Sequence, residues 1–187
     1  MDGSWDHRMF RKKLKGSELE SFFRYIREEP LEADQLVFLC IGTDRSTGDA
    51  LGPIVGTMLE DAGYAHVIGT LRRPFDASNM LARLQEIPPG KKVIAIDACL
   101  GQAASVGCFQ VSNQPLMPGK AVGMGLPGVG DYGVAAIVNV DEGNKYSILQ
   151  STSLYKVLEM AKAIARAVIA VFPLEEDSEE GEDSDET

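Results

Sequence analysis

The chain has 187 residues, of which 44% are hydrophobic, so it has the size and the apolar content of one ordinary domain. Its formal net charge is -10, but residues 174–187 alone carry nine acidic side chains and no basic one, which leaves the rest close to neutral. A chain without a basic stripe is not expected to bind nucleic acid, and no apolar run reaches the roughly 18 residues that span a bilayer. We therefore expect neither nucleic acid nor a membrane as a partner.

The three cysteines, Cys40, Cys99 and Cys108, lie in or beside apolar runs. An odd number of buried thiols favours a reducing compartment over a disulfide framework. No charged and then apolar leader opens the sequence. These features predict a cytoplasmic protein.

The sequence divides into three parts. Residues 1–16 form a basic N-terminal leader, residues 17–173 a single α/β domain, and residues 174–187 an acidic tail too polar to fold. We interpret the leader as a solvated segment without a function of its own; its basic side chains are Arg8, Arg11, Lys12, Lys13 and Lys15.

The first predicted element is a helix over residues 17–29, because a capping box at its start precedes apolar side chains at helical spacing. The continuous apolar run Leu36–Ile41 then predicts a strand that is covered on both faces. A polar loop leads from Gly42 into a helix that ends near Gly63, with Asp49 at or near its N-cap.

Strands and helices continue to alternate beyond this point. The predicted elements are strand 66–71, helix 76–87, strand 92–97, strand 107–112, strand 134–140 and helix 153–172. Alternation at these lengths is typical of βαβ units with right-handed crossovers. The expected fold is therefore three-layer α/β/α with a mainly parallel sheet.

Ligands of an open parallel sheet bind where the carboxyl ends of its strands meet. Asp44 and Asp49 follow the first strand, and Asp97 ends the strand that begins at Lys92. If these strands are neighbours, one carboxyl of a close pair keeps its proton, and the pair can act as general base and general acid. The two acids could equally hold a divalent metal, or simply cap a helix and begin a turn.

Residues 40–53, which read CIGTDRSTGDALGP, and residues 93–98, which read VIAIDA, resemble the YyaC-type sporulation proteins (DUF1256). More distantly they are similar to germination protease and to the hydrogenase-maturation endopeptidases. The resemblance implies a phosphorylase/hydrolase-like fold and an endopeptidase in the mother cell or forespore of a spore-forming bacterium, with small acid-soluble spore proteins as candidate substrates. It also implies that Asp49 and Asp97 are the catalytic pair.

The maturation endopeptidases bind a metal through two such acids and a histidine from a later loop. The chain has two histidines, His7 and His66, and neither follows the second acid. In this respect the sequence departs from those enzymes, so we expect a metal-free pair and no cofactor, with a divalent metal shared by Asp49 and Asp97 as the alternative.

Three further residues are candidates for binding the substrate. Asp44 and Arg45 precede Asp49 in the same loop, where Arg45 could orient a carbonyl or form an ordinary surface ion pair. Asp131 ends the glycine-rich segment 119–131, which could close over the carboxylates or form plain turns.

The sequence also bears on other functional classes. A thiol hydrolase using Cys99 lacks a neighbouring base, and the loop after the first strand lacks the glycine pattern of a nucleotide-binding fold. A non-catalytic, sporulation-linked binding or regulatory protein that keeps the fold and the acids remains open, as does the oligomeric state.

Overall fold

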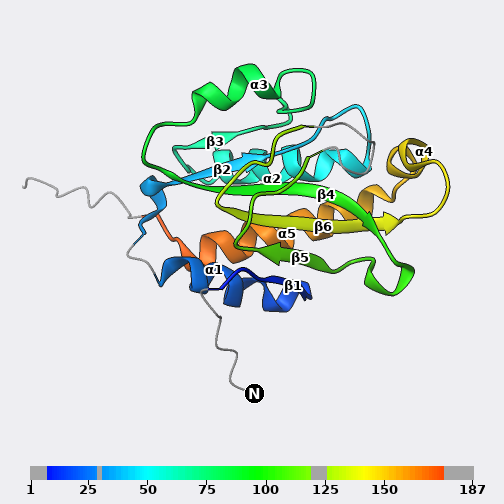
Figure 1. The fold of residues 1–187 in the computed structure, drawn as a ribbon, viewed down its shortest axis with the longest axis horizontal. Coiled ribbons are helices and arrows are strands. Elements are labelled where there is room, and N and C mark those ends of the chain that lie inside the picture. The colour runs from blue at the N-terminus through cyan, green and yellow to red at the C-terminus, as the bar shows by residue number, and fades with distance from the viewer. Residues whose placement is uncertain (1–7, 29–30, 119–125, 175–187) are drawn as a thin grey trace, which may run out of the picture.

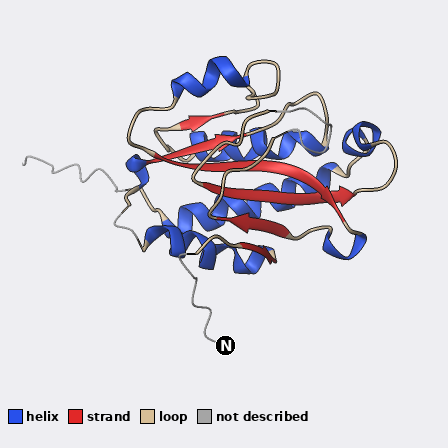
Figure 2. Ribbon diagram, viewed as in Figure 1, coloured by secondary structure: helices blue, strands red, loops and turns tan. Residues whose placement is uncertain are grey.

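A computed structural model describes residues 8–28, 31–118 and 126–174, which form one six-stranded sheet with helices on both faces (Figures 1 and 2). The strands are β1 Arg11–Leu14, β2 Leu36–Cys40, β3 Val67–Ile68, β4 Lys92–Gly101, β5 Phe109–Ser112 and β6 Tyr132–Val140. The helices are α1 Leu19–Arg27, α2 Leu51–Asp61, α3 Met80–Arg83, α4 Lys145–Gln150 and α5 Leu154–Val171.

The strand order is β1-β5-β6-β4-β2-β3. Strands β3, β2, β4 and β6 pair in parallel, whereas β5 runs antiparallel to both β6 and β1. The prediction of a mainly parallel sheet is therefore confirmed. None of the helices in the described ranges combines the length and the hydrophobicity that a membrane span requires.

Strand β2 shows why the sheet needs cover on both sides. Its side chains alternate between two cores: Phe38 and Cys40 belong to the core under α1, α2 and α5, while Val37 and Leu39 belong to the core on the α3 side. A strand buried on both faces must be apolar at every position, as β2 is. This arrangement confirms the three-layer α/β/α fold.

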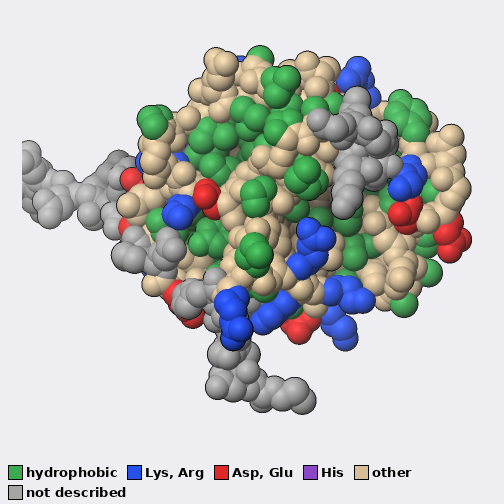
Figure 3. Space-filling model, in the orientation of Figure 1, with side chains coloured by type: hydrophobic (Ala, Val, Ile, Leu, Met, Phe, Trp, Pro, Cys, Tyr) green, Lys and Arg blue, Asp and Glu red, His purple; other side chains and the backbone are tan. Residues whose placement is uncertain are grey.

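The basic segment before α1 is part of the sheet. Arg11–Leu14, which lies within the predicted leader, forms β1 and pairs with β5 at one edge. The Lys13 ammonium donates to the Ser105 hydroxyl at 2.9 Å, and basic side chains gather on this part of the surface in Figure 3. Lysines on an edge strand discourage pairing with another sheet, so these charges have a structural role. The folded domain thus begins before residue 17.

Several boundaries differ from the predicted ones. β4 continues four residues past Asp97 because it stays paired with β6, and α3 is one turn followed by a 3₁₀ turn at residues 84–86. Helix α4 was not predicted. Residues 119–125 of the glycine-rich segment and residues 175–187 of the predicted tail lie outside the described residues.

Candidate functional site

Strand β2, which precedes Asp49, and strand β4, which contains Asp97, are neighbours, and this adjacency is the condition on which the predicted pair of acids depended. β2 pairs in parallel with β4 up to Cys40 and Ile96, and the Ile41 amide still donates to the Ile96 carbonyl at 2.7 Å. Beyond Ile41 the segment that follows β2 leaves the sheet. Asp97 therefore sits just past the end of β2 while it remains paired with Ala135 of β6.

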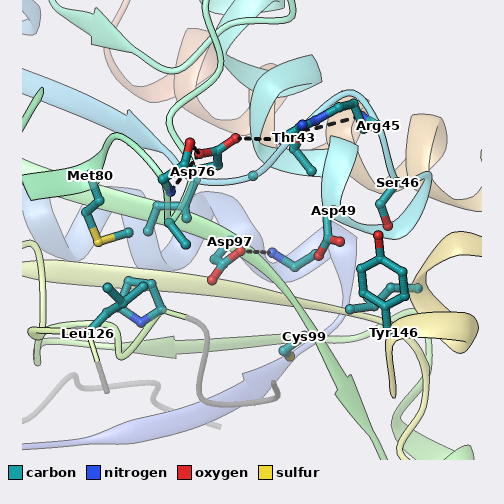
Figure 4. A pocket seen from close by; sticks show the side chains of 17 residues that line it. Thr43, Arg45, Ser46, Asp49, Asp76, Met80, Asp97, Cys99, Leu126 and Tyr146 are labelled. Atoms are coloured by element: carbon teal, nitrogen blue, oxygen red, sulfur yellow. Dashed lines mark hydrogen bonds and ion pairs between the residues drawn. The ribbon is translucent and has the colours of Figure 1, made fainter. Parts of the chain in front are cut away.

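A pocket of about 560 Å³ opens beside Asp97. Its polar side chains are Thr43, Arg45, Ser46, Asp49, Asp76, Ser78, Asp97, Cys99 and Tyr146; its larger apolar ones are Ile41, Met80, Leu126 and Leu149. Figure 4 shows Asp49 and Asp97 next to each other, with Met80 and Leu126 on one side and Tyr146 on the other. The structure thus brings the two predicted catalytic residues into one cavity.

Tight packing of α2 against the end of β2 holds Asp49 at the pocket. A Cβ added to Gly52 would lie 2.0 Å from the Ile41 carbonyl oxygen, so only glycine allows this approach. Gly42 has a φ of 145°, a backbone conformation that favours glycine. Gly42 and Gly52 therefore set the distance between the Asp49 loop and the sheet.

The Asp49 carboxylate is not a helix cap. Neither α2 nor the 3₁₀ turn before it, Gly48–Ala50, has a side-chain cap. Burial raises the pKa of Asp49, and the nearby Ser46 hydroxyl partly offsets this rise, although it lies outside hydrogen-bond geometry. The capping role that the spacing allowed is therefore absent, and the carboxylate faces the pocket.

Asp97 holds its proton more tightly. The pKa of Asp97 is raised to about 8, mainly by burial. The Ala98 amide, which donates to Oδ1 at 2.8 Å, opposes this rise, whereas the charge of Asp49 adds to it. At neutral pH Asp97 is therefore mostly protonated, and Asp49 is the acid of the pair that ionises first. One pocket thus contains a proton donor and a proton acceptor.

Of the three predicted substrate-binding residues, only Arg45 lines the pocket. Its guanidinium forms an ion pair with Asp76 at 3.4 Å and is 77% exposed, so the pair alone adds little stability. Asp44 is exposed and lies outside the pocket lining. Asp76 was not among the predicted site residues; it reaches the pocket because Phe75 bridges Ile41 in parallel, which makes Asp76 a further acid at the end of an extended segment.

Asp131 lies at the other end of the sheet. Its carboxylate accepts a hydrogen bond from the Val93 amide at 2.8 Å, four residues before Asp97 and so about 13 Å away along β4. The reason is topological: β6 is parallel to β4, and Asp131 precedes the first residue of β6. The structure therefore does not bring Asp131 to the predicted site but gives it a role in joining β4 to β6.

The pocket offers a weak nucleophile and an incomplete set of metal ligands. Burial, Asp97 and Asp141 raise the pKa of the Cys99 thiol to about 12, which keeps it protonated. Among the described residues no three His, Cys, Asp or Glu side chains are grouped as a metal site would require, and His66 does not line the pocket. The residues present thus do not fit a three-ligand metal centre.

Comparison with known proteins supports the family resemblance that residues 40–53, in and around the β2–α2 loop, indicated. Residues 11–167 match a family model described as "Protein of unknown function (DUF1256)". The chain is also 46% identical over 138 residues to "Uncharacterized protein YyaC" of Bacillus subtilis (strain 168), a match that covers 71% of this chain and 67% of that protein. Because the family model spans most of the chain, the protein belongs to the DUF1256 family.

Proposed function

We propose that this protein is an endopeptidase in which Asp49 and Asp97 activate water against a peptide bond. The observation that carries the proposal is the shared pocket, in which the pKa values of both carboxyl groups are raised. Among the described residues neither acid forms an ion pair, and the Arg45 guanidinium pairs with Asp76 instead. Carboxyl groups with raised pKa values in a cleft are candidates for acid and base catalysis.

The two acids have complementary roles in the proposed reaction. Ionised Asp49 takes a proton from water while the water oxygen attacks the carbonyl carbon. Protonated Asp97 then gives its proton to the amine nitrogen as the carbon–nitrogen bond breaks. The products are a carboxylic acid and an amine, and a proton passes from Asp49 back to Asp97 to complete the cycle. No redox partner or metal enters this balance.

The walls of the pocket indicate the class of substrate. Met80 and Leu126 lie on one side of Asp97, so an apolar side chain next to the scissile bond would be accommodated there. The resemblance to sporulation proteins makes small acid-soluble spore proteins the first candidates, in the cytoplasm of a spore-forming cell.

A cleavage assay tests the proposal. Wild type, Asp49→Asn and Asp97→Asn are incubated with small acid-soluble spore proteins and with a mixed peptide pool, with and without a chelator, and products are identified by mass spectrometry. Loss of a general acid or base is expected to lower the rate by about 10²- to 10⁴-fold. Asp44→Asn, an exposed acid of the same loop, is the matched control and should cleave like wild type.

The outcomes separate the two functional classes. Full cleavage by either pocket variant contradicts the aspartate pair. If the wild type cleaves none of these substrates but binds peptides at the pocket, with Asp49→Asn weakening binding, the result favours the non-catalytic binding protein.

A further inference from the structure

The hydroxyl of Ser46 is a buried polar group with no hydrogen-bond partner in the part of the chain that the structure describes. Residues 46–49 read Ser-Thr-Gly-Asp, which has the spacing of a capping box, but neither helical turn in this region has a side-chain cap. Ser46 is 5% exposed, and its Oγ makes no hydrogen bond with any described residue. Buried hydroxyls without partners are rare in folded proteins and call for an explanation.

Two ordinary explanations fail for this hydroxyl. A purely structural role is disfavoured, because leaving a buried hydroxyl unpaired destabilises the fold relative to alanine. Direct contact with a ligand is also disfavoured, since the Oγ atom has almost no exposed surface even though Ser46 lines the pocket. The carboxylate of Asp49 is close enough to serve as its acceptor, because the Ser46 hydroxyl lowers the pKa of that group.

We propose that Ser46 positions Asp49 for catalysis: when Asp49 ionises, the Ser46 hydroxyl donates a hydrogen bond to its carboxylate and turns the free oxygen toward the attacking water. This inference rests on the proposed peptidase function and adds a residue to it. Ser46 does not touch the substrate; it acts through Asp49. The carbonyl of Ser46 accepts a hydrogen bond from the Ala50 amide at 3.0 Å. This bond holds the backbone of Ser46 and Asp49 in one turn.

Other charged and titratable groups share the cavity with Asp49. They are Arg45, Asp76, Asp97, Cys99 and Tyr146. Arg45 is paired with Asp76, and the Asp97 Oδ1 atom already accepts from the Ala98 amide. A neutral donor beside Asp49 therefore favours its ionised form without adding a charge that would neutralise the pair.

Kinetics of Ser46→Ala test the inference. Loss of a hydrogen bond to a charged group is expected to lower kcat by about 10- to 100-fold, with KM unchanged. The acid limb of the pH–rate profile should move to higher pH, while the melting temperature stays equal or rises. Ser46→Thr keeps the hydroxyl and should retain most of the activity. Thr47→Ala, which removes the neighbouring hydroxyl outside the pocket lining, should match wild type.

A second measurement does not depend on turnover. Carboxyl carbon NMR of the full chain follows the titration of Asp49, whose pKa should rise in Ser46→Ala and stay near the wild-type value in Ser46→Thr. A raised pKa in a protein that cleaves nothing would refute the peptidase and support the Ser46–Asp49 contact. An unchanged Asp49 titration, or wild-type kcat and pH profile in Ser46→Ala, would overturn the inference. If Ser46→Ala does not fold, Ser46→Cys, a near-isosteric weak donor, takes its place with the same expectations.

Discussion

The carboxyl group of Asp97 should make the stability of the fold depend on pH. Its pKa is about 8 in the folded protein, against an ordinary value of 3.8. Between these values the folded protein keeps a proton that the unfolded chain has lost, so the free energy of unfolding falls as the pH rises. At about 1.4 kcal/mol per unit the full penalty is on the order of 6 kcal/mol, reached above pH 8 and absent below about pH 4.

Asp97→Asn removes this penalty, because a neutral amide replaces the carboxyl group. Chemical denaturation of both proteins at pH 5, 7 and 9 should show the variant gaining on wild type by about 3 kcal/mol across the series, which allows for partial solvation of the site. Asp44→Asn, an exposed acid of the β2–α2 loop, is the control and should follow wild type. Parallel stability curves for wild type and Asp97→Asn would refute the argument that burial holds the proton.

Two further predictions concern packing and the pocket thiol. Gly52→Ala should destabilise the fold by about 3 kcal/mol or more, because the new Cβ would lie 2.0 Å from the Ile41 carbonyl oxygen. Thermal unfolding measures this loss. Gly16→Ala is the control, because its new Cβ would meet no atom closer than 3.4 Å. Cys99 should react with iodoacetamide at pH 7.5 at least about 100-fold more slowly than in the unfolded chain, because burial raises the pKa of its thiol to about 12. Wild-type stability of Gly52→Ala would contradict the packing argument. Equal labelling rates of Cys99 in the folded and the unfolded chain would contradict the argument that burial keeps the thiol protonated.

The parts of the fold that sequence patterns predicted are those with strong local signals. The unbroken apolar run of β2 could only be a strand buried on both faces, and the apolar stripe of α5 marks one long helix. Asp49 was expected to follow one strand and Asp97 to end another, and the observed adjacency of the parallel strands β2 and β4 brings the two acids together, although β4 continues past Asp97. These elements follow from residue type and spacing alone.

The features that were missed depend on pairing between distant segments. Nothing within the Arg11–Leu14 sequence indicates a strand; it becomes β1 because β5 offers an open edge. The place of Asp131 depends on the direction of β6 relative to β4, which spacing does not reveal. Likewise Asp76 reaches the pocket through the bridge between Ile41 and Phe75. A local pattern cannot encode such contacts, because each needs a partner far away in the chain.

The difference in length between β2 and β4 explains why the pocket and the raised pKa of Asp97 occur together. Where β2 ends, β4 loses a neighbour on one side, and loop residues rather than a strand cover the gap. A loop shields Asp97 from water without supplying the charged partner that would stabilise its ionised form, so its pKa rises. A longer β2 would fill the gap, cut Asp97 off from the pocket and remove the cavity. The stability that Asp97 costs above pH 4 is therefore inseparable from the opening through which the proposed substrate would reach it.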